Sequence, residues 1–193
     1  MSALPSTIKN DTFHPLYEQF MLHTKCDKND RYFAIILSSW IKKKGVLPQC
    51  IGLSIQDFRE LMGAHFPGLQ ISERVRENEV FDLKRMPERD DLVRLFDSSR
   101  ANSGRSEIWV SQLITAACLG SNHLWQDLGL WNRNQLSELI AINFPALARK
   151  NTKNMKWKKF LYKQLCIEEG IYICRSPSCE VCIDYVDCFG PEE

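Results

Sequence analysis

The sequence lacks long hydrophobic runs, an excess of charge of either sign, and the motifs that identify common enzymes. No apolar stretch approaches the roughly 20 residues that a bilayer-spanning helix needs, so we expect no membrane segment. The net charge is +1, which argues against a general nucleic-acid binder. There is no glycine-rich phosphate loop, no G-x-S-x-G and no H-E-x-x-H, so nothing in the sequence supports an enzyme.

A secretory signal is also missing from the first residues. MSALPSTIKNDTF contains no basic region followed by an apolar stretch, and we therefore expect a cytoplasmic protein. Hydrophobic residues make up 44% of the chain and charged residues 25%, as in ordinary globular domains. In a reducing compartment, clustered cysteines are more often metal ligands than disulfides.

The apolar residues recur at helical intervals almost throughout, and no alternating strand pattern precedes the cysteine-rich end. One helix face is formed by residues spaced three and four apart, namely Phe33, Ile36, Leu37, Trp40 and Ile41. Three lysines at 42–44 and then Gly45 suit a helix end, because cations favour the negative pole and glycine permits a left-handed cap. The sequence therefore predicts an all-α fold.

Two segments 78 residues apart are similar. SIQDFRELM begins at residue 54 and is followed by FPGL, while NRNQLSELI begins at residue 132 and is followed by FPAL. Each opens with a residue suited to an N-cap and closes with Phe-Pro, where proline disfavours further helix. The similarity predicts two related helical halves, about 13–85 and 90–150, joined by a charged stretch at 73–91. The alternative is chance similarity between two capped amphipathic helices.

A basic helix is expected at 153–168, ending before Gly170. No acidic residue lies between Leu139 and Ile167, whereas seven cations do: Arg149, Lys150, Lys153, Lys156, Lys158, Lys159 and Lys163. This charge could attract an oxyanion, stabilise a negatively charged cluster or steer an acidic partner, although a solvated helix face is the simplest interpretation. We expect a helical body over 1–170 and an irregular cysteine-rich tail over 171–193.

Four of the eight cysteines lie close together in this tail. They are spaced C-x4-C-x2-C-x5-C at Cys174, Cys179, Cys182 and Cys188. Thiolates are soft ligands that favour zinc, copper(I) or iron–sulfur clusters. Structural zinc sites prefer two separated cysteine pairs, so the spacing alone leaves zinc and iron–sulfur equally supported, with two disulfides as a third alternative.

Other cysteines and histidines are weaker candidates. Cys166 lies eight residues before Cys174 and could reach a metal in the tail, but a helical cysteine is more often buried, and Cys118 still more so. His123 lies in a turn-like segment and could bind metal. For His123, and for His65 in the first half, a hydrogen-bonded structural role is the more common one.

The tail, the preceding MKWKKFLYKQLC and the segment HLWQDLGL together resemble the NifQ family of nitrogen-fixation proteins. The C-x4-C-x2-C-x5-C spacing is that family's identifying motif, and all four positions are filled here. The resemblance implies a carrier without catalytic turnover, in which Cys174, Cys179, Cys182 and Cys188 hold an iron–sulfur cluster with molybdenum.

The resemblance also implies a cargo and partners. Molybdate or another molybdenum species would be passed to nitrogenase cofactor-assembly proteins, a scaffold or a reductase component or both, to build the iron–molybdenum cofactor. No nucleic-acid partner is expected. The alternative that the residues leave open is a zinc-stabilised helical module that binds another protein.

Overall fold

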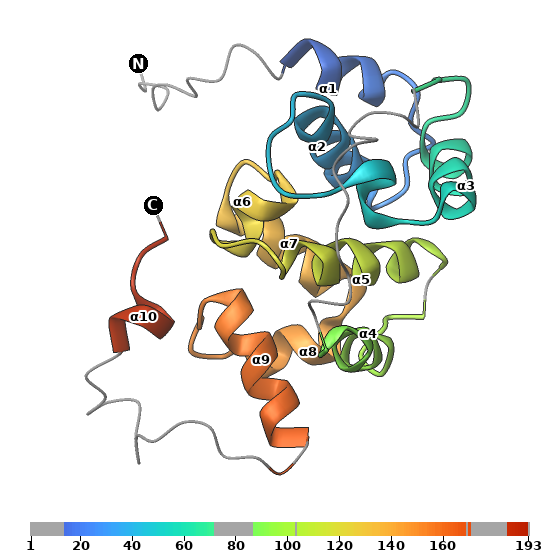
Figure 1. Cartoon of the computed structure of the whole chain (residues 1–193). Helices are drawn as coiled ribbons and strands as arrows, with labels where there is room; N and C mark the ends of the chain where they lie inside the picture. The colour runs from blue at the N-terminus through green and yellow to red at the C-terminus, as the bar shows by residue number, and fades with distance from the viewer. Residues whose placement is uncertain (1–13, 72–86, 103, 169, 171–184, 193) are drawn as a thin grey trace, which may run out of the picture.

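The computed structural model describes residues 14–71, 87–102, 104–168, 170 and 185–192. In chain order the elements are α1 (His14–Met21), α2 (Asp30–Ile41), the 3-10 helix η1 (Gln49–Gly52), α3 (Ile55–His65), α4 (Arg89–Asp97), α5 (Ser106–Ala117), α6 (Leu124–Leu128), α7 (Arg133–Asn143), α8 (Pro145–Lys150), α9 (Trp157–Glu168) and α10 (Tyr185–Phe189) (Figure 1). These residues contain helices and no strand, which confirms the all-α prediction. No described helix is both long and apolar enough to cross a bilayer.

Helices α2 and α5 form the centre of the hydrophobic core. Ten of the twelve residues of α2 and nine of the twelve of α5 are buried. A surface helix buries only one face, so both helices must be surrounded by others. The predicted apolar face at 33–41 belongs to α2, in which Trp40 packs against Phe58 of α3 with ring centroids 5.7 Å apart.

The two similar segments begin in the same way. Helices α3 and α7 each contain eleven residues. The Ser54 hydroxyl accepts a hydrogen bond from the Asp57 amide at 3.0 Å, and the Asn132 side-chain oxygen Oδ1 accepts one from the Gln135 amide at 3.0 Å. Each bond satisfies one of the amides that a helix start leaves unpaired.

The two segments also end alike. Phe66 and Phe144 close their helices with φ/ψ of −133°/59° and −133°/61°. Each ring is buried against another phenylalanine, Phe20 in the first case and Phe96 in the second. The local similarity is therefore structural as well as sequential. The division into halves at about 13–85 and 90–150 stays a prediction.

The end of α2 differs in detail from the expected glycine cap. The helix ends at Ile41, and both Lys43 and Gly45 have positive φ, 56° and 71°. A Cβ atom at Gly45 would lie 2.6 Å from the Asp127 carbonyl oxygen, which accepts a hydrogen bond from the Val46 amide at 2.9 Å. Glycine is thus needed here because the backbone passes close to α6.

The basic helix and the tail also depart from expectation. Helix α9 begins at Trp157, four residues later than predicted. Asn154 has a left-handed φ of +53°, and the Lys156 amide donates to the Cys188 carbonyl instead of to an earlier carbonyl of a helix. Part of the tail expected to be irregular forms α10. Its Tyr185 and Phe189 rings stack at 4.7 Å, one helical turn apart.

Candidate metal site and the adjoining groove

One of the four tail cysteines lies among the described residues. Cys188 is in α10, is half-buried, and forms no disulfide within the described part of the chain. Cys174, Cys179 and Cys182 lie outside the described residues, so the convergence of the four thiols stays a prediction. A partly accessible thiol on the surface of the core fits the role of a metal ligand.

Lys156 holds α10 against the start of α9. Its amide donates to the Cys188 carbonyl at 2.7 Å, and its ammonium donates to the Val186 carbonyl at 3.1 Å. Cys188 and Phe189 also pack against the hydrophobic core. These contacts give Cys188 a defined place beside α9. Figure 1 shows α10, the helix that contains it, near the carboxyl terminus.

A second connection holds the residues that follow α10. Arg133, the first residue of α7, donates one Nη to the Glu192 carboxylate at 2.7 Å and the other to the Asn154 side chain at 2.8 Å and the Met155 carbonyl at 3.0 Å. The Glu192 side chain is only 3% exposed. Arg133 is hydrogen-bonded both to the turn before α9 and to Glu192, and it therefore fixes the position of the carboxyl-terminal residues relative to that turn.

We expect Arg133→Ala to loosen residues 185–192 while the central helices stay intact. The substitution leaves the buried Glu192 carboxylate without its arginine, and solvating that carboxylate requires the segment to move outward. Hydrogen exchange with mass spectrometry should show faster exchange at 185–192 and unchanged exchange in α2 and α5. Arg149→Ala, an exposed cation on α8, is the control. Equal protection at 185–192 in both variants would contradict the role assigned to Arg133.

A groove of about 590 Å³ lies next to Cys188, between the start of α6, the first turn of α9 and the α10 segment. It is lined by Ser121, Asn122, His123, Leu124, Gln126, Lys156, Lys158, Lys159, Asp187 and Glu192. The expected metal ligand directly follows one lining residue, Asp187, in the chain. The groove therefore lies beside one residue of the expected ligand set, Cys188.

One lining residue, Lys158, forms an ion pair with a buried carboxylate. The Lys158 ammonium pairs with the Asp127 carboxylate and donates to the Gly120 carbonyl at 2.8 Å. Asp127 is completely buried and also accepts from the Asn122 amide at 3.1 Å. These hydrogen bonds hold both charges in place.

Cys118 and Cys166, the two cysteines considered as further ligands, lie in different surroundings. Cys118 follows α5 and is only 6% exposed, and burial raises the pKa of its thiol to about 12. It is therefore a neutral core residue, as predicted. Cys166 is half-buried on α9 but does not line the groove, since it lies ten residues beyond Lys156, or about 15 Å along the helix axis. Its ligation stays a prediction.

The two histidines have different surroundings. His123 lines the groove, and its Nδ1 atom lies 3.9 Å from a Glu192 carboxylate oxygen. It therefore shares the groove with Asp187, the residue before Cys188, and its ligation of a metal stays a prediction. His65 is 2% exposed and lies elsewhere, at the end of α3.

His65 belongs to a buried hydrogen-bond network between three helices. Its Nδ1 lies 2.6 Å from the Asp30 carboxylate of α2, and its Nε2 lies 2.9 Å from the Ser106 hydroxyl of α5. Asp27, Asp30 and His65 each offer one possible ligand atom, and these three atoms lie within 4.8 Å of one another. Both ring nitrogens already have hydrogen-bond partners, so the arrangement serves structure. The sequence contained no signal that would have identified Asp30 or Ser106 as partners.

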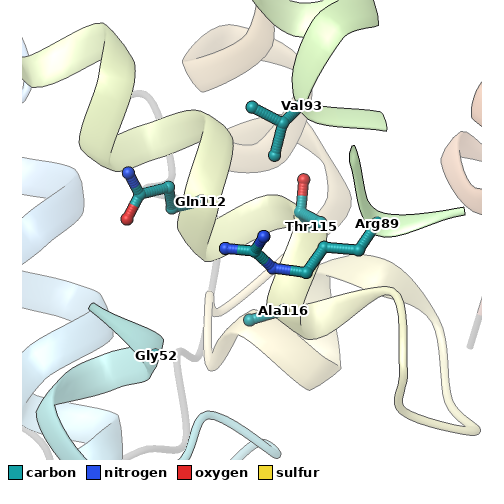
Figure 2. Close-up of a pocket in the computed structure, with 6 residues that line it drawn as sticks. All are labelled: Gly52, Arg89, Val93, Gln112, Thr115 and Ala116. Atoms are coloured by element: carbon teal, nitrogen blue, oxygen red, sulfur yellow. The ribbon is translucent and has the colours of Figure 1, made fainter. Parts of the chain in front are cut away.

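A second cavity lies between η1, α4 and α5 (Figure 2). Its volume of about 10 Å³ has room for roughly one water molecule. It is lined by Gly52, Arg89, Val93, Gln112, Thr115 and Ala116. The cavity is too small for a metal cluster or an oxyanion, which leaves the groove as the larger of the two.

Comparison with known proteins agrees with the motif. A family model described as NifQ matches residues 32–190, a range that includes all four tail cysteines. Protein NifQ of Azotobacter vinelandii is 44% identical over 156 residues, which cover 76% of this chain and 80% of the relative. A NifQ homolog of Sinorhizobium fredii is 36% identical over 170 residues, covering 85% of this chain and 73% of the relative. Protein NifQ of Rhodobacter capsulatus is 34% identical over 151 residues, which cover 77% of this chain and 80% of the relative.

No solved structure matches the chain. The family match nevertheless extends over most of its length, and the relatives align over at least 73% of their own. The chain belongs to the NifQ family.

Proposed function

We propose that this protein is an iron–sulfur carrier that delivers molybdenum for assembly of the iron–molybdenum cofactor of nitrogenase. Membership of the NifQ family supports a role in nitrogen fixation. The observation that carries the finer proposal is the complete four-cysteine motif within the family match. Soft thiolate ligands in this number suit an iron–sulfur cluster.

The residues that would hold the cluster are Cys174, Cys179, Cys182 and Cys188. When bound, an iron–sulfur cluster would supply bridging sulfides for molybdenum, the cargo. The described ligand fits this role, because Cys188 is half-buried and its carbonyl is hydrogen-bonded to Lys156 at 2.7 Å. Its position is thus set by contacts with the helical body.

Transfer requires a partner, and we propose the nitrogenase cofactor-assembly proteins, a scaffold or a reductase component or both. The surface of α10 supports docking next to the cysteines. Tyr185 and Val186 are 46% and 65% exposed, although both are apolar or aromatic. Exposed apolar groups of this kind are suited to transient protein contacts. We assign the protein a cytoplasmic carrier role without catalytic turnover.

Elemental analysis tests the proposal. Protein purified without oxygen should be brown and contain iron, acid-labile sulfide and molybdenum, with a paramagnetic resonance signal from the cluster. A colourless protein with stoichiometric zinc, and with neither iron nor labile sulfide, would contradict it. That result would support the zinc-stabilised interaction module instead.

A further inference from the structure

We infer that the groove beside Cys188 is a binding site for a tetrahedral oxyanion, with molybdate as the ligand if the proposed function is correct. The inference rests on the proposed function for the identity of the anion. The site itself is inferred from the charge, the volume and the position of the groove.

Two lysines of the groove lining carry positive charge that is not used in an ion pair among the described residues. The Lys156 ammonium donates to a neutral acceptor, the Val186 carbonyl, at 3.1 Å. Lys159 lines the same groove and is exposed. Within the described part of the chain, neither ammonium forms an ion pair. Both are therefore available to donate charge-assisted hydrogen bonds to an oxyanion.

Most of the negative charge near the groove is already neutralised. Glu192 is paired with Arg133 at 2.7 Å, and Asp127 is paired with Lys158. Asp187 is the remaining carboxylate of the lining, and it opposes an anion. When these partners are included, four cations face three carboxylates, so the site keeps one net positive charge.

The size and the remaining lining also suit a small anion. The volume of about 590 Å³ lies within the range of roughly 300–1,000 Å³ that small-molecule sites occupy. Ser121 contributes a hydroxyl and His123 an imidazole, both capable of hydrogen-bonding to an oxyanion.

The position of the groove links it to the cysteines. The Lys156 amide binds the Cys188 carbonyl at 2.7 Å, so the residue that provides a groove ammonium also contacts the expected metal ligand. An oxyanion held by Lys156 and Lys159 would lie close to Cys188, one of the four residues expected to receive molybdenum. The groove is thus inferred to concentrate the cargo beside its destination.

Calorimetric titration of the full-length protein, purified without oxygen, tests this inference. Molybdate and sulfate are used in separate titrations, since sulfate shares the shape and charge of molybdate but does not bind thiolates. We expect both anions to bind and to compete for one site. Lys156→Gln combined with Lys159→Gln should weaken both by about tenfold, because two charge-assisted hydrogen bonds are lost.

Two further variants make the test specific. Asp187→Asn should strengthen binding about threefold, because it removes the unpaired carboxylate. Lys163→Gln is the matched control, since Lys163 is exposed on α9 one turn beyond Lys159 but does not line the groove, and it should change the affinity less than twofold. Glutamine at 156 keeps the backbone bond to Cys188, and circular dichroism should confirm an unchanged fold.

Several outcomes would overturn the inference. One is that the unsubstituted protein binds neither anion. Another is that Lys163→Gln weakens anion binding as much as the double variant does. The third is that the double variant binds molybdate as tightly as the unsubstituted protein, which would place the anion on the cysteines. Iron content is measured in parallel, so the two proposals fail separately. An iron-free protein that shows the expected pattern of anion binding would support the groove and contradict the cluster.

Discussion

Cys179→Ser and Cys188→Ser should each purify without iron, labile sulfide or molybdenum while keeping their helical content. A serine hydroxyl stays protonated at neutral pH and is a hard donor, so it replaces a thiolate poorly as a ligand of iron. We expect the core to stay folded, because Cys188 lies on a short helix at its edge and the buried residues of α2 and α5 lie elsewhere. Metal and sulfide analysis with far-ultraviolet circular dichroism measures both effects.

Cys26→Ser is the control for these variants. Cys26 is exposed between α1 and α2, outside the four-cysteine motif, and this variant should retain its iron. If Cys179→Ser or Cys188→Ser kept a full complement of iron, the motif would not be the cluster site. If either lost its helicity, the metal would be stabilising the fold, as the zinc alternative requires.

His65→Leu should lower the free energy of unfolding by about 3 kcal/mol, because it leaves one member of a buried polar pair without its partner. Asp30 is 2% exposed, and its Oδ1 atom would lose the His65 contact at 2.6 Å. Its Oδ2 atom keeps the hydrogen bond from the Asp27 amide at 2.8 Å, which limits the loss. For a chain of this length, the melting temperature should fall by roughly 6–12 °C.

A double-mutant cycle separates the pair from general packing effects. Asp30→Asn should cost less in the His65→Leu background than in the unsubstituted protein, because the shared interaction is lost only once. Ser106→Ala, which removes the hydroxyl beside Nε2, should cost about 1 kcal/mol. Iron content should stay unchanged in all of these variants. Loss of iron with unchanged stability would instead identify His65 as a metal ligand.

The stability of the His65 network and the metal content of the tail are therefore expected to vary independently. His65 connects α2, α3 and α5, whereas Cys188 is attached through Lys156 and the residues around α9. Mutations in the two regions share no described hydrogen-bond partner, and their effects should add.

Features that act over a few residues could be predicted without the structure. The all-α fold followed from helical spacing, and the starts and ends of α3 and α7 followed from Ser54, Asn132 and the two Phe-Pro pairs. These signals suffice because capping bonds and proline sterics involve near neighbours in the chain. The cysteine spacing is likewise local, and it predicted the candidate site and the family.

The groove and its supports depend instead on contacts between distant segments. Arg133 and Glu192 are 59 residues apart, and Lys158 and Asp127 are 31 apart, with no spacing pattern that connects them. The later start of α9 also follows from such a contact, between Lys156 and Cys188. Helix packing decides which side chains meet, and no short segment encodes that packing. The basic residues were therefore visible in the sequence, while their arrangement beside residues 185–192 was not.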